Sequence, residues 1–162
     1  MSNSKKIRMS IIIIILAIIF IDQITKIIII NNNNQEFGQV CLNYEKQEQN
    51  DGFVMSILTD LVVFIIIIKF LKEQDKNMDN KVRVSLSFIL GGGISNFIDK
   101  IWNKDVIEFI KIGRLPVINI AYIMTTVGWV LFVILMVQNT IKTNDEIKQI
   151  NRQRAEIGRD KK

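Results

Sequence analysis

Long runs of apolar residues, separated by short polar phrases, dominate this chain. Three of the runs contain uninterrupted isoleucine, at 11–15, 27–30 and 65–68. These blocks show neither the alternation of a half-buried strand nor the stripe of a helix on a soluble core. The pattern therefore predicts an all-α integral membrane protein.

Four stretches are long enough to cross a hydrocarbon layer, which takes about 20 mostly apolar residues. The predicted spans lie near 9–30, 53–71, 82–101 and 116–138. Asp60 interrupts the second span, and Lys69 closes it. A polar outer loop, 31–52, follows the first span, and a charged tail, 139–162, follows the fourth. We expect a single membrane domain, 1–162, with four transmembrane helices.

The basic residues are distributed unevenly between the two sides of this topology. Three lie in 1–8, five in 69–83 and seven in 142–162, which is 15 of the 21 in the chain. Loops rich in Lys and Arg stay in the cytoplasm, so we expect both termini there. The net charge of +5 is then explained by topology and by attraction to anionic lipid head groups. We expect no nucleic-acid partner.

Several kinds of chemistry are excluded. The chain has no histidine, which removes Ser-His-Asp, Cys-His and zinc-His sites. Its single cysteine, Cys41 in the outer loop, cannot form an internal disulfide. The glycines Gly91–Gly93 lie inside a predicted span, where close helix packing explains them better than phosphate binding. We expect no metal and no cofactor.

The polar phrases are the candidate functional elements, because polar groups at membrane depth are costly and are usually functional. In IDQITK (21–26), Asp22 and Lys26 are four residues apart and share one helical face. A structural ion pair explains this spacing at least as well as a direct functional role. In GGGISNFIDK (91–100), polar residues recur every three to four positions. They form one stripe on a helix, which could also be a packing face with a buried polar contact.

Five phrases occur in an order that resembles the lipoprotein signal peptidase (signal peptidase II) family. IDQITK is similar to the family's D-Q-x-[ST]-K, and NDGFVMS (50–56) to its N-x-G-A-A-F-S. GGGISNFIDK, VIEF (106–109) and NIAY (119–122) are similar to GG-x-x-x-N-x-x-D-R, V-V-D-F and N-x-A-D. The resemblance implies four transmembrane helices and a small extracytoplasmic β-cradle in 31–52. It also implies a bacterial cytoplasmic membrane protein.

The family is an aspartic endopeptidase that removes signal peptides from diacylglyceryl-modified prolipoproteins without a metal or cofactor. The resemblance therefore implies the lipid bilayer and such prolipoproteins, or their signal peptides, as partners. It assigns supporting or substrate-groove roles to Asp22, Lys26, Asn50, Gly52, Asn96, Asp99, Lys100, Asn119 and Ala121. Lys100 stands where the family has Arg, and so lacks the bidentate fork.

The two catalytic aspartates of the family align with Glu108 and Tyr122. Glutamate can act as an acid or base, but its extra methylene moves the carboxylate by about 1.5 Å in a mechanism that tolerates little misplacement. An aspartic protease shares one proton between two carboxylates. A phenol is a poor general base at neutral pH, and its ring would fill the cleft.

Three hypotheses follow. The first is a divergent member of the family that keeps the scaffold and substrate binding while proteolysis is lost or impaired. The second is an active peptidase with a non-standard carboxylate pair drawn from Asp99, Asp105 and Glu108. The third is an unrelated small subunit of a membrane complex.

Overall fold

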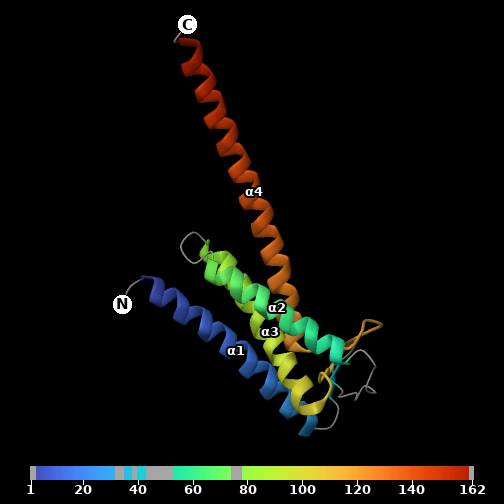
Figure 1. Cartoon of the computed structure of the whole chain (residues 1–162). Helices are drawn as coiled ribbons and strands as arrows, with labels where there is room; N and C mark the ends of the chain where they lie inside the picture. The colour runs from blue at the N-terminus through green and yellow to red at the C-terminus, as the bar shows by residue number, and fades with distance from the viewer. Residues whose placement is uncertain (1–2, 32–34, 38–39, 43–52, 74–77, 161–162) are drawn as a thin grey trace.

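The computed structural model describes residues 3–31, 35–37, 40–42, 53–73 and 78–160. Four helices account for most of them, and three short strands lie at one end of the helices (Figure 1). The elements are α1 (Asn3–Asn31), β1 (Gln35–Phe37), β2 (Val40–Leu42), α2 (Phe53–Glu73), α3 (Asn80–Asn103), β3 (Ile110–Ile112) and α4 (Ile120–Asp160). The predicted four-helix, all-α membrane architecture is confirmed.

Helix α3 is the centre of the bundle, because it packs against each of the other three helices. Its residues Val82, Leu86, Ile89 and Leu90 form a buried cluster with Ile67 of α2. By contrast, many large apolar side chains of α1, α2 and α4 are exposed, as expected for surfaces that face lipid.

Close helix packing explains two glycines. A Cβ atom on Gly92 would lie 2.3 Å from the backbone oxygen of Ala121, and one on Gly128 would lie 2.8 Å from that of Ser85. Both glycines are therefore required for α3 and α4 to approach each other. This agrees with the packing role expected for the 91–93 glycines.

Three helices are long and apolar enough to span a membrane: Ile7–Asn31, Val54–Lys72 and Ile120–Arg154. They correspond to the first, second and fourth predicted spans. The third predicted span, 82–101, lies in α3. Within the described part of the chain, this helix is less apolar than those three spans and is not among the helices apolar enough to span a membrane. Its glycine, serine, asparagine and aspartate residues lower its hydropathy. Ser85, Ser87, Gly91, Gly92, Ser95 and Asp99 are buried in the bundle.

The fourth span was predicted to start near residue 116, and the first residue of α4 lies four positions later. Pro116 and Val117 lie outside any helix or strand. Ile118 exchanges backbone hydrogen bonds of 2.8 and 2.9 Å with Ile110. Helix α4 begins only at Ile120. It then continues through the predicted tail and runs well beyond the other helices (Figure 1).

A three-stranded antiparallel sheet has the order β1-β2-β3. Two strands come from the loop in which a β-cradle was predicted, and Cys41 pairs there with Glu36 on one side and Lys111 on the other. The third strand, β3, follows α3 and was not predicted. Asn50 and Gly52 lie outside the described residues.

Candidate active site

A buried ion cluster joins α1 to α3. The ammonium nitrogen of Lys26 lies 2.5 Å from Asp22 Oδ2 and 2.6 Å from Asp99 Oδ2. All three side chains are at most 1% exposed. The predicted pairing of Asp22 with Lys26 is present, and Asp99 joins it from 73 residues away. Burying these charges is tolerable because each is paired and hydrogen-bonded.

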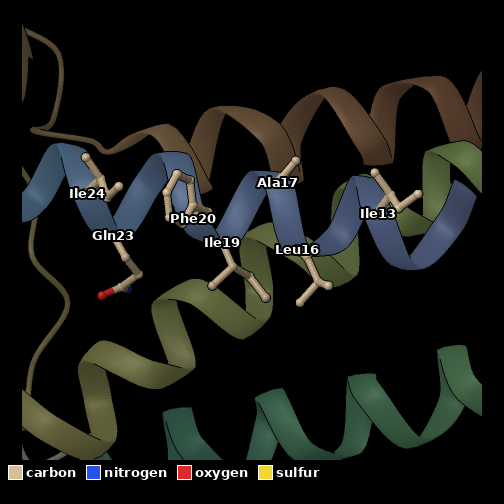
Figure 2. Close-up of a pocket in the computed structure, with 7 residues that line it drawn as sticks. All are labelled: Ile13, Leu16, Ala17, Ile19, Phe20, Gln23 and Ile24. Atoms are coloured by element: carbon tan, nitrogen blue, oxygen red, sulfur yellow. The ribbon is translucent and has the colours of Figure 1, made fainter. Parts of the chain in front are cut away.

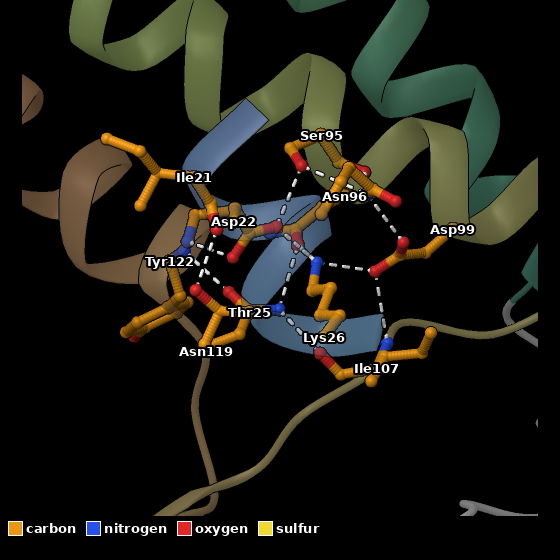
Figure 3. A network of polar contacts seen from close by, with 12 residues as sticks. Ile21, Asp22, Thr25, Lys26, Ser95, Asn96, Asp99, Ile107, Asn119 and Tyr122 are labelled. Carbon is orange, nitrogen blue, oxygen red and sulfur yellow. Dashed lines mark hydrogen bonds and ion pairs between the residues drawn. The ribbon is translucent and has the colours of Figure 1, made fainter. Parts of the chain in front are cut away.

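Amide and hydroxyl groups complete the cluster (Figure 3). Ser95 Oγ donates to Asp22 Oδ2 at 2.7 Å, and Gln23 Nε2 donates to Asp99 Oδ1 at 2.8 Å. Lys26 also donates to Asn96 Oδ1 at 3.3 Å. Gln23 was not among the predicted site residues, although it directly follows Asp22 in the phrase IDQITK.

The cluster holds the backbone next to Glu108. Asp99 Oδ2 accepts a 3.2 Å hydrogen bond from the Ile107 N–H, and Asn119 Nδ2 donates to the Ile107 carbonyl at 3.0 Å. Both polar groups of the residue that precedes Glu108 are thus fixed by side chains from α3 and from the start of α4.

The same cluster holds the backbone at Tyr122. Asp22 Oδ1 accepts from the Ala121 N–H at 2.8 Å, and Asn119 Oδ1 accepts from the Tyr122 N–H at 2.7 Å. Asn119 directly precedes α4, so this second contact is an N-cap. The positions of Glu108 and Tyr122 are therefore set by one polar network, although neither side chain is bonded within it in the described residues.

Glu108 and Tyr122 line the same pocket, which has a volume of about 430 Å³. The other lining residues are apolar: Ile112, Leu115, Pro116, Val117 and Ile118. Tyr122 is 52% exposed, and its ring points away from Lys26 (Figure 3). Glu108 and Tyr122 thus meet at one cavity, whose lining contains a single carboxylate.

The electrostatic surroundings of Glu108 favour its protonated form. Partial burial raises the pKa of this carboxyl above its ordinary value of 4.5, and the negative charge of Asp105 raises it further. The positive charge of Lys26 acts in the opposite direction. Glu108 therefore keeps its proton to a higher pH than an exposed glutamate does.

Other acids close to the pocket have different partners. Both oxygens of Asp99 are engaged in the ion cluster, and Asp105 Oδ1 accepts from the Val106 N–H at 2.8 Å. Lys100, a predicted supporting residue, contacts Asp60 Oδ2 on α2 at 2.6 Å instead of joining the cluster. In the sequence alone, Asp60 stands out only as an interruption of the second span.

A second, shallow depression runs along the outer face of α1 (Figure 2). Its volume is about 610 Å³, and its lining is Ile13, Leu16, Ala17, Ile19, Phe20, Gln23 and Ile24. Gln23 is its only polar side chain, and this residue also contacts the ion cluster. In the part of the chain that the structure describes, no group of three Cys, Asp or Glu side chains is arranged to hold a metal ion.

Comparison with known proteins gives a consistent result. Residues 14–138 match the Signal peptidase (SPase) II family. The chain is 33% identical to lipoprotein signal peptidases of Listeria monocytogenes (strain HCC23) and Listeria innocua (strain CLIP 11262), over 81% of this chain and 95% of each relative. The fold is similar to that of a bacterial membrane enzyme solved in meso at 2.3 Å resolution. That likeness has a TM-score of 0.71 and 21% identity, over 81% of this chain and 89% of the other.

The matched region includes the four polar phrases around the ion cluster and the pocket, and it extends through the apolar part of α4. The hypothesis of an unrelated membrane subunit is therefore not supported. The chain is a multi-pass bacterial membrane protein that belongs to the signal peptidase II family.

Proposed function

We propose that this protein keeps the scaffold and substrate-binding surfaces of a signal peptidase II, whereas its proteolytic activity is lost or strongly impaired. The observation that carries the proposal is Tyr122. Tyr122 aligns with the second catalytic aspartate of the family, and it lines the pocket that Glu108 also lines.

The chemistry of the pocket supports loss of activity. Two carboxylates that share a proton can activate water and polarise the scissile carbonyl at the same time. Glu108 can supply one of these functions, but the phenol of Tyr122 cannot replace an ionised carboxylate as the base. The acids Asp22 and Asp99 are held by Lys26, so neither is available to take its place.

The apolar character of the pocket supports retained binding. Its lining between Ile112 and Ile118 suits the apolar part of a signal peptide or the acyl chains of a diacylglyceryl-modified prolipoprotein. The depression along α1 offers a second apolar surface on the lipid side.

We also infer that both termini lie in the cytoplasm and that the pocket faces the outer side. The start of α1, the end of α2 and the start of α3 lie at one end of the bundle, and the sheet lies at the other (Figure 1). The 15 basic residues of the predicted cytoplasmic segments favour this orientation.

A gel-shift cleavage assay on a diacylglyceryl-modified prolipoprotein tests the loss of activity. The wild type, Tyr122→Asp and Glu108→Asp/Tyr122→Asp are compared in lipid. We expect little cleavage by the wild type and gain of cleavage in the double variant. Wild-type cleavage as fast as that of an ordinary family member would overturn the proposal.

Photo-crosslinking tests the retained binding separately. A crosslinking residue at Leu115, in the pocket, should capture the prolipoprotein. The same residue at Leu131, an exposed lipid-facing position of α4, serves as the matched control. Equal capture at both positions would argue against a substrate pocket.

The interaction between Asp105 and Glu108 favours a second candidate, an active peptidase that uses this non-standard pair. It requires that wild-type protein cleaves the prolipoprotein and that Glu108→Gln abolishes cleavage. Asp105→Asn should then reduce cleavage strongly. Unchanged cleavage in Glu108→Gln would exclude this candidate.

A further inference from the structure

A separate cavity of about 560 Å³ lies among α1, α2 and α3, and it contains none of the residues of the Glu108 pocket or the ion cluster. Its lining residues are Arg8, Ile11, Ile12, Ile68, Leu71, Lys72 and Arg83. Three of these seven are basic, four are apolar and none is acidic. The cavity therefore combines positive charge with an apolar wall.

The basic residues lie where the apolar spans begin or end. Arg8 is the second residue of the span Ile7–Asn31, and Lys72 is the last residue of the span Val54–Lys72. Arg83 lies in the first turn of α3. The cavity thus lies at the level of lipid head groups, and its isoleucines continue toward the hydrocarbon layer.

Arg83 lines this cavity and is largely buried. It is only 7% exposed, and its Nε donates to the Met78 carbonyl at 3.4 Å. A guanidinium group has five N–H donors in a rigid fork that fits phosphate oxygens. Nearby, Asp79 uses Oδ1 to cap α3 by accepting from the Lys81 N–H at 3.0 Å.

We propose that this cavity is a binding site for an anionic phospholipid. The phosphate would contact Arg8, Lys72 and Arg83, and one acyl chain would lie against Ile12 and Ile68. Basic pockets between transmembrane helices are suited to anionic head groups. The apolar wall favours a lipid over free phosphate, which would leave that wall uncovered.

Native mass spectrometry of the full-length protein in detergent tests this site. Dioleoyl phosphatidylglycerol is titrated against wild type and Arg8→Gln/Lys72→Gln, in which both exposed cations are removed and the buried Arg83 is kept. We expect the double variant to bind this lipid roughly thirtyfold more weakly, since each basic residue contributes about 1 kcal/mol. Lys148→Gln/Arg152→Gln, which removes two exposed charges from the far part of α4, should change the affinity less than about twofold.

Two further ligands test whether the cavity prefers an anionic phospholipid to a neutral lipid or to free phosphate. Dioleoyl phosphatidylcholine has the same acyl chains without net charge and should bind much more weakly to the wild type than phosphatidylglycerol does. Inorganic phosphate should not compete at millimolar concentration. Unchanged phosphatidylglycerol affinity in Arg8→Gln/Lys72→Gln, equal binding of the two lipids, or competition by inorganic phosphate would overturn the proposal. Circular dichroism of each variant verifies that the helices remain folded.

Discussion

Asp22 Oδ1 on α1 accepts a 2.8 Å hydrogen bond from the backbone N–H of Ala121 in the first turn of α4. A carboxylate at a helix N-terminus is stabilised by the helix dipole and by the N–H groups that have no partner within the helix. The other oxygen of Asp22 is bound by Lys26 and Ser95. A residue of the first helix thus fixes the start of the last one and, with it, the position of Tyr122.

Loss of the buried cation should be severely destabilising. In Lys26→Met, Asp22 and Asp99 would remain buried at the same point without a counter-charge. We expect the free energy of unfolding in mild detergent to fall by about 3–5 kcal/mol. The matched control, Lys148→Met, removes an exposed charge that lies 3.9 Å from Asp145, and it should cost no more than about 0.5 kcal/mol. A similar small loss in both variants would contradict the structural role of the cluster.

The cap of α4 should contribute more than an ordinary helix cap. Asn119→Ala removes the bond to the Tyr122 N–H and also leaves the buried Ile107 carbonyl without its donor. We expect a loss of about 2–3 kcal/mol. Asp79→Ala, which removes the exposed cap of α3, should cost about 1 kcal/mol. Denaturant unfolding of the two variants compares them, and equal losses would show that Asn119 acts only as a cap.

Close packing of α3 on α4 should not tolerate a methyl group at Gly92. Its Cβ would lie 2.3 Å from both the Ala121 carbonyl oxygen and Thr125 Oγ1. Gly92→Ala should therefore separate the helices and lower the free energy of unfolding by about 3 kcal/mol or more. Gly93→Ala is the control, because its Cβ would meet the ring edge of Phe64 at 2.9 Å, and a side chain can move. Thermal unfolding should rank Gly92→Ala as the less stable variant, and the reverse order would contradict the packing described.

The stability of the protein should depend on the ionisation of Glu108. Because the pKa of this carboxyl is raised in the folded state, its contribution is complete below the ordinary value of 4.5 and is lost as pH rises through the raised value. Glu108→Gln removes this loss. The variant should therefore gain in melting temperature relative to wild type as the pH rises from below 4.5 to above the raised pKa of Glu108.

Asp105→Asn supplies the control for this pH dependence. Removing the negative charge of Asp105 lowers the folded-state pKa of Glu108, so the loss of stability should be smaller and should end at a lower pH than in the wild type. Differences between Glu108→Gln and wild type that do not change with pH would show that the effect is one of packing.

Local patterns in the sequence determined most of the secondary structure. The isoleucine blocks predicted the end of α1 and both ends of α2 to within two residues. This was possible because a membrane span is recognised from the hydropathy of consecutive residues. The four-residue spacing likewise placed Asp22 and Lys26 in contact. Helix α4 starts after the predicted beginning of the fourth span because Ile118 pairs with Ile110, and that pairing depends on a residue outside the span.

Long-range contacts were decided only by the tertiary structure. Asp60 meets Lys100 across 40 residues, and Asp99 meets Lys26 across 73. The spacing of these residues along the chain does not predict that they pair, since each pair forms only when two helices pack against each other in one particular arrangement. The sequence by itself determined the four helices and the family. Only the tertiary structure decided that a single buried ion cluster holds the backbone beside both Glu108 and Tyr122, because buried charges must find partners wherever the packed helices place them.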